Sequence, residues 1–278
     1  MSSHRMLSKL RLLCTALAAI GIVSALLPMP SVHAAIYQLS STSMKQFDRI
    51  KAASTQTNAS KLQSLYDDFL QLQSENAARD AKLKATSKQN DEYESALRKR
   101  ISSIDKVKIE QLAIKVQQTK DRYQPLFNRY AAATAELKAA KKLGVKELTA
   151  AAQLQKDLLE ISVKAAKADI ASAEAELKTA KSSASAAMKR LRSQLDAIKK
   201  EEQRITPERS AVSQLNKQKS AEWSDLLYAL RTNDAASAKK SLTTLGNLLR
   251  ELADRQKKIV GYETRITAIL DSVSSQLK

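Results

Sequence analysis

The chain has 278 residues, of which 43% are hydrophobic but only 4% are aromatic, and it contains just four glycines and four prolines. Its 47 basic and 29 acidic side chains give a formal net charge of +18. This composition is typical of long helices. It argues against an enzyme, because substrate clefts are usually lined with apolar and aromatic groups.

Residues 1–34 are expected to be a secretory signal peptide. A basic start precedes an apolar run from Leu12 to Leu27, and prolines and small residues then lead to Ala34. An uncleaved anchor is the alternative, but the run is shorter than the roughly 20 residues that a membrane-spanning helix needs. We therefore expect cleavage after Ala34 and a location outside the cytoplasm.

Cleavage there would leave a mature chain without histidine or cysteine, because His4, His33 and Cys14 all precede the cut. Such a chain cannot build a Ser-His-Asp triad, a cysteine nucleophile or a zinc site with nitrogen and sulfur ligands. A carboxylate pair or a Ser–Lys pair would be the remaining route to catalysis. The sequence therefore predicts a protein that is not an enzyme and has no metal or cofactor.

The mature chain would carry a net charge of +15, because the leader holds three basic residues and no acidic ones. The positive excess is spread along the chain, whereas nucleic-acid binding favours a clustered basic stripe. We therefore do not expect a nucleic-acid partner. A field of this sign favours anionic polymers or acidic lipid head groups, and a basic but merely solvated helical surface is the alternative.

Residues 40–90 are expected to be helical, and residues 35–42 are expected to be loose. The stretch SKLQSLYDDFLQL places Leu62, Tyr66 and Phe69 on one face of a helix. The polar stretch ATSKQND at 85–91 is interpreted as a junction, at which Asp91 begins a new helix with Glu94 as its capping-box partner.

The next helix is predicted over 91–142. Its apolar positions recur about every 3.7 residues, which indicates little left-handed supercoil, and Lys108 is the clear misfit in this stripe. Pro125 lies inside the segment, so a kink is expected there with Gln124 outside helical geometry.

Gly144 is interpreted as a helix stop, because cations in a last turn followed by glycine are typical of a helix C-terminus. After it, apolar residues at a spacing of about 3.5 predict a second long helix over 146–205. A short stop between two amphipathic helices makes them antiparallel. Residues 91–206 are therefore predicted to form an antiparallel coiled-coil arm with its tip at 143–145.

A new helix is predicted to begin at Thr206 and Pro207, which suit the N-cap and the first helical position. Asn233 and Asp234 should separate this helix from a leucine-rich final helix. The predicted fold is all-α, with a helical-bundle head (40–90 and 207–278), the coiled-coil arm and no β-sheet. One continuous elongated bundle, with the C-terminal helices packed along the arm, is the alternative.

The tip is the strongest candidate for a binding site. Leu143 and Val145 flank the glycine where a two-helix end is too narrow to bury both, and Lys141, Lys142 and Lys146 surround them. Apolar residues ringed by cations suit an anionic or membrane surface. In the alternative, the two apolar residues close the seam and the lysines are only solvated.

These patterns favour a secreted, non-enzymatic scaffold or adaptor of the bacterial cell envelope, which binds a protein partner or an anionic wall polymer. The alternative is a peripheral protein that contacts acidic lipid through the basic tip. Pore formation is not expected, because no apolar run after the leader approaches the length of a spanning helix. Self-association is left open.

Overall fold

The computed structural model describes residues 36–277, so the expected signal peptide and its cleavage site after Ala34 lie outside the described residues. The described chain is a long helical bundle without a strand, which confirms the all-α prediction for these residues. Its helices are α1 (Ser41–Ala52), α2 (Gln56–Ser102), α3 (Lys106–Leu143), α4 (Lys146–Leu195), α5 (Ile198–Arg231) and α6 (Ala235–Ser275).

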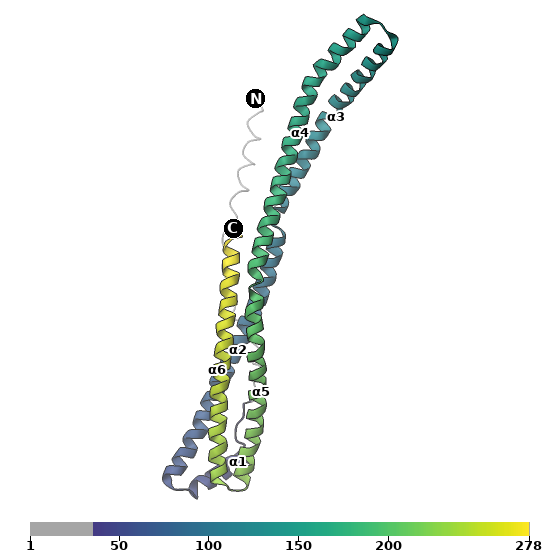
Figure 1. The fold of residues 1–278 in the computed structure, drawn as a ribbon. Coiled ribbons are helices and arrows are strands. Elements are labelled where there is room, and N and C mark those ends of the chain that lie inside the picture. The colour runs from purple at the N-terminus through teal and green to yellow at the C-terminus, as the bar shows by residue number, and fades with distance from the viewer. Residues whose placement is uncertain (1–35, 278) are drawn as a thin grey trace, which may run out of the picture. The chain divides into compact units, whose positions relative to one another are not determined.

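Helix α6 packs along both α2 and α5, and α3 packs along α4 (Figure 1). Asn76 hydrogen bonds to the backbone of Leu249, and Asn90 to that of Glu263, so α2 and α6 run parallel. Two ion pairs join α5 and α6, Glu201–Arg265 and Glu208–Arg255. The residue number rises along α5 from one pair to the next and falls along α6, so these two helices are antiparallel.

Two helix breaks were not predicted from the sequence. Residues 196–197 separate α4 from α5 inside the expected helix 146–205, and residues 103–105 separate α2 from α3 inside the expected helix 91–142. Between α2 and α3 the chain turns at residues 103–105, where Asp105 has a left-handed φ of 54°, a conformation that a short polar side chain tolerates. The expected junction and capping box at Asp91 are wrong, because α2 runs through residues 85–91 without a break. Leu83, Asn90 and Leu97 are buried on one face across this stretch, so tertiary packing keeps the polar segment helical.

The helix start predicted at Thr206 and Pro207 is also wrong. Both residues lie inside α5, and the Thr206 hydroxyl donates to the carbonyl oxygen of Glu202 at 3.0 Å. Burial of Ile198 and Ile205 on the same helix offsets the cost of an interior proline, about 3 kcal/mol.

Pro125 also lies inside a helix, α3. Gln124 remains helical, contrary to expectation. The separation of α5 from α6 is as predicted: Asn233 has φ 55°, and the Asp234 carboxylate accepts from the backbone N–H of Ser237 at 3.0 Å.

An aromatic core joins α1, α2, α5 and α6. Phe69 stacks on Trp223 with ring centroids 5.4 Å apart and an interplanar angle of 17°, and Tyr37 lies 5.4 Å from the same indole. Around them are buried, among others, Phe47, Ile50, Leu62, Tyr66, Leu226, Leu230, Leu242, Leu245 and Leu249. A second buried cluster joins α2, α4, α5 and α6 and includes Leu97, Ile101, Leu191, Leu195, Ile198, Ile259, Ile266 and Leu270.

The segment before α1 is held in place, so the expectation that residues 35–42 are loose is wrong for the described part. The side-chain amide of Gln73 pairs with the Tyr37 backbone, accepting from its N–H at 2.8 Å and donating to its carbonyl at 3.1 Å. The Leu39 N–H donates to the Tyr66 hydroxyl, and Leu39 is buried. These side-chain contacts come from α2 and leave no periodic signal in the segment itself.

Lys219 packs beside this segment, with its ammonium 5.3 Å from the centre of the Tyr37 ring. Burial lowers its pKa from the ordinary 10.5, so the charged form costs stability at neutral pH and stability should rise as pH rises through the folded-state pKa. We expect Lys219→Met to raise the melting temperature at neutral pH, by an amount that shrinks toward pH 10.5. Circular dichroism melts over this pH range measure the difference. A variant less stable at neutral pH would mean that the contact with the Tyr37 ring outweighs the desolvation.

Candidate functional site

Gly144 ends α3 in the left-handed conformation, with φ 75° and ψ 5°, and α4 begins two residues later at Lys146. Glycine adopts this conformation without the steric cost that a side chain would add. The predicted helix stop is therefore present, and it places the ends of two long helices at one turn. We call residues 141–146 the turn.

All five residues predicted for the site are exposed at this turn. Leu143 is 72% exposed and Val145 41%. Lys141, Lys142 and Lys146 are exposed too, and within the part of the chain that the structure describes none of the three forms an ion pair. The structure thus brings an apolar pair and three solvated cations together, within six residues of chain.

The exposed apolar surface extends further along α4 than the sequence predicts. Leu148 is one of the apolar residues that recur about every 3.5 positions in the predicted helix 146–205, yet it is 52% exposed. Among the described residues of α4, Val163 is the first to be fully buried. The reason is that α3 is the only described helix packed against this end of α4, and its facing residues include small ones such as Ala133 and Ala140.

Three ion pairs across α3 and α4 accompany the seam: Lys115–Glu176 at 2.8 Å, Lys120–Glu174 at 2.6 Å and Arg122–Asp169 at 2.6 Å. Each is about half exposed, so each adds little stability. From one ion pair to the next the residue number rises along α3 and falls along α4, so these two helices are antiparallel. Lys108, the misfit in the stripe of α3, is exposed and needs no buried partner.

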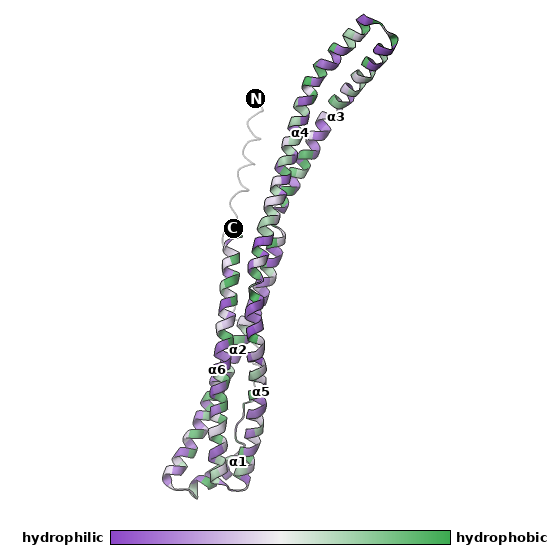
Figure 2. Cartoon of the chain, viewed as in Figure 1, coloured by the Kyte–Doolittle hydropathy of each residue, from purple (hydrophilic) through white to green (hydrophobic). Residues whose placement is uncertain are grey.

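A groove of about 690 Å³ runs between α3 and α4 next to the turn. Leu154 and Leu158 line it from α4, and each is 63% exposed. Arg129, Ala132 and Glu136 line it from α3. Figure 2 shows hydrophobic and hydrophilic residues mixed along both helices up to the turn. This surface was not predicted from the sequence, although the spacing of Leu154, Leu158 and Ile161 indicates a second apolar stripe on α4.

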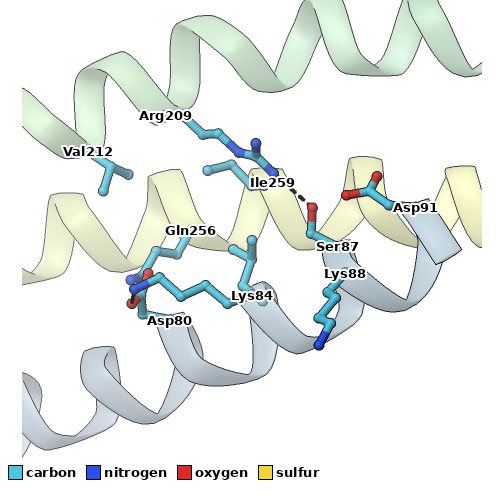
Figure 3. A pocket seen from close by; sticks show the side chains of 10 residues that line it. Asp80, Lys84, Ser87, Lys88, Asp91, Arg209, Val212, Gln256 and Ile259 are labelled. Carbon is cyan, nitrogen blue, oxygen red and sulfur yellow. Dashed lines mark hydrogen bonds and ion pairs between the residues drawn. The ribbon is translucent and has the colours of Figure 1, made fainter. Parts of the chain in front are cut away.

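A second candidate is a cleft of about 440 Å³ between α2, α5 and α6 (Figure 3). Several of its charged residues are in ion pairs: Arg209 lies 3.3 Å from Glu263 and also donates to Ser87 at 3.0 Å, and Lys84 lies 2.8 Å from Asp80. Gln256 is buried below it and donates to the Asn76 carbonyl, whereas its Oε1 has no hydrogen-bond partner among the described residues.

Beside this cleft lies a buried carboxylate. Glu263 is 3% exposed, accepts from Asn90 at 2.9 Å and contacts Arg209 at 3.3 Å. Thr267 donates to the Asn90 side-chain oxygen at 2.9 Å. These contacts tie α2, α5 and α6 together, so Glu263 helps to hold the bundle.

Two further features bear on function. Among the described residues there is no group of three or more His, Cys, Asp or Glu side chains placed to hold a metal ion. No helix of residues 36–277 is apolar over a length that would cross a membrane.

The fold and the turn together define an all-α helical-bundle protein with an exposed basic and apolar turn between two of its longest helices. No protein-family model matches this chain, and neither does any curated protein or solved structure.

Proposed function

We propose that this protein is a secreted, non-enzymatic scaffold or adaptor of the bacterial cell envelope, which docks on an anionic wall polymer through the turn. In this proposal α3 and α4 act as an antiparallel coiled-coil arm within residues 91–206, and residues 40–90 and 207–278 act as its head. The second buried cluster packs α6 of the head against residues 97–101 and 191–205, at the base of the arm. The aromatic core supports the head, because its buried residues come from 39–69 and 223–249.

The exposure of the turn is the observation that carries the proposal. Three lysines that are exposed and form no ion pair among the described residues leave their charge available to an anionic surface. Leu143, exposed by 72%, adds an apolar contact at the same point. A helical scaffold that presents such a turn suits recognition of charge and surface rather than turnover of a substrate.

A second candidate function is peripheral binding to an acidic membrane. Leu143, Val145 and Leu148 are exposed together beside the lysines, and an apolar cluster rimmed by lysines suits the boundary between head groups and acyl chains. An acidic patch on another protein is a third candidate partner, because it is negatively charged like the wall polymer and the acidic membrane.

The test is co-sedimentation of residues 35–278 with purified cell wall, with or without its anionic polymers, and with acidic or neutral vesicles at low and high salt. The key variant carries Lys141→Glu, Lys142→Glu and Lys146→Glu. Each lysine near an anionic surface contributes about 1 kcal/mol, so we expect binding at least about a hundredfold weaker. Binding of the unchanged protein should also weaken at high salt.

The matched control carries Lys45→Glu, Lys61→Glu and Lys82→Glu, three exposed lysines far from the turn in sequence. This control changes the net charge equally, so it should bind almost as well as the unchanged protein if the turn is the site. Equal losses in both variants, or no pelleting of the unchanged protein, would contradict docking through the turn.

Leu143→Gln with Val145→Gln separates the wall from the membrane. Removing the two apolar side chains should reduce pelleting with acidic vesicles and leave binding to the wall polymer almost unchanged. Binding to neither wall nor vesicles, in any variant, would direct the search to a protein partner.

A further inference from the structure

An exposed apolar stripe runs along α4 on a face that α3 does not cover. Leu154, Leu158 and Ile161 are 63%, 63% and 72% exposed, and Ala165 and Ala168 continue the line and are exposed as well. The steps of four, three, four and three residues are those of the a and d positions in a coiled coil. The stripe is thus an unpaired coiled-coil seam.

We propose that this stripe binds the same stripe of a second copy of the chain, so that two α4 helices pair antiparallel about a twofold axis between Leu158 and Ile161. In an antiparallel pair each a residue meets a d residue of the other helix. Leu158 then meets Ile161 of the second copy at the axis, and Leu154 meets Ala165. Two large side chains, Leu158 and Ile161, therefore meet at the axis. On either side of the axis a large side chain, Leu154, meets a small one, Ala165, so the seam is filled without crowding.

The charges beside the stripe favour this pairing. Asp157 and Lys164 occupy the two positions that flank the stripe on one side, one on each side of the axis. Antiparallel pairing brings Asp157 of each copy next to Lys164 of the other, so both contacts join opposite charges. On the other side Gln155 meets Ser162, which is neutral.

Parallel pairing is less favourable by the same reasoning. It would place Lys164 beside Asp169 of the second copy, but Asp169 already accepts from Arg122 at 2.6 Å and from the Tyr123 hydroxyl at 2.9 Å in its own chain. Asp157 would then face Ser162 and gain no cation. In the antiparallel pair Asp157 and Lys164 each meet an opposite charge. Their present partners, Gln153 at 2.7 Å and Glu160 at 3.2 Å, lie one turn away on α4 itself, whereas Asp169 holds α4 to α3.

The pairing has a consequence for the turn. Gly144 lies about 16 residues from the axis, or about 24 Å along a helix. The two turns of a dimer would therefore point in opposite directions and lie about 50 Å apart. A dimer of this kind presents two identical contact points, whatever the turns bind.

The first test is sedimentation equilibrium of residues 35–278 over a wide range of concentration. The stripe is short compared with a standard protein interface, so we expect a reversible dimer that forms as concentration rises. Leu158→Lys with Ile161→Lys should weaken dimerisation at least tenfold. Ile114→Lys, a change of an equally exposed apolar residue on α3, should leave it unchanged. A monomer at every concentration, or equal loss in the control, would overturn the proposal.

A charge exchange tests the register. Asp157→Lys alone should weaken the dimer, because it places two lysines together at each contact, and Lys164→Asp alone should do so by pairing two aspartates. The double variant should restore dimerisation. If the double variant stays as weak as the single ones, the proposed contact between these two residues is wrong.

Disulfide cross-linking tests direction, and Cys14 is the chain's single cysteine, so residues 35–278 have none of their own. Chains carrying Leu158→Cys are mixed with differently tagged chains carrying Ile161→Cys. Antiparallel pairing predicts cross-links between the two kinds of chain, because a disulfide needs Cα atoms within about 7 Å. Cross-linking of Leu158→Cys mainly with itself would indicate parallel pairing and overturn the proposal.

Discussion

Replacing Phe69 by alanine should lower the free energy of unfolding by about 3–5 kcal/mol, the usual cost of deleting a buried aromatic ring. Phe69 is completely buried and stacks on Trp223. The change would remove one face of this stack and leave a cavity between α2 and α5. No neighbouring element is free to fill it, because α1 and α6 already pack around the same cluster.

Urea unfolding followed by fluorescence measures this effect well, since Trp223 is the chain's single tryptophan and lies against the deleted ring. Circular dichroism in the same samples reports the loss of helix independently. Tyr228→Ala is the control, because Tyr228 is also an aromatic residue but is 63% exposed. It should change stability by no more than about 0.5 kcal/mol. Similar losses in the two variants would contradict the assignment of Phe69 to the core.

The buried polar layer gives the second large effect. Asn90→Leu removes the side-chain donor that holds the Glu263 carboxylate at 2.9 Å. A buried charge that loses such a partner is strongly destabilising, so we expect a loss of about 2–4 kcal/mol. Thr267 loses its contact with Asn90 but retains its hydrogen bond to the Glu263 backbone at 3.1 Å. Gln89→Leu, at the exposed neighbouring position, should have little effect.

The double variant Asn90→Leu with Glu263→Leu separates the cost of an unpaired charge from the value of the pair. Replacing both partners by apolar groups is often neutral, so we expect the double variant to lie within about 1 kcal/mol of the unchanged protein. Chemical denaturation of all four proteins completes the cycle. A double variant that loses the sum of both single effects would show that the two residues act independently.

The parts of the fold that could be predicted from the sequence are those set by local chemistry. Glycine at 144 and the Asn233–Asp234 pair end helices through backbone preference and capping, which depend on few neighbours. The all-α class follows from helical periodicity along the whole chain. Leu143 and Val145 lie at the turn, where two helices cannot enclose them, so their exposure could be anticipated from position alone.

Most of the missed features depend on contacts between distant segments. Pro207 and the polar stretch at 85–91 are favourable helix boundaries by local rules, yet both lie inside helices because residues on either side are buried against other helices. The segment at 36–40 has no helical or strand pattern and is placed by Gln73 and Tyr66. The break between α2 and α3 at Asp105 was not predicted, because the local sequence signals for a helix end there are weaker than the helical periodicity on both sides.

The sequence alone determined that the described chain is helical and that a basic, apolar turn lies between two long helices. Only the tertiary structure decided which apolar stripes are buried. Periodicity shows that a helix has an apolar face but does not show whether another helix covers that face. On α4 it cannot distinguish the seam through Val163 and Ala166, buried against α3, from the stripe at Leu154, Leu158 and Ile161, exposed because no described helix packs on it.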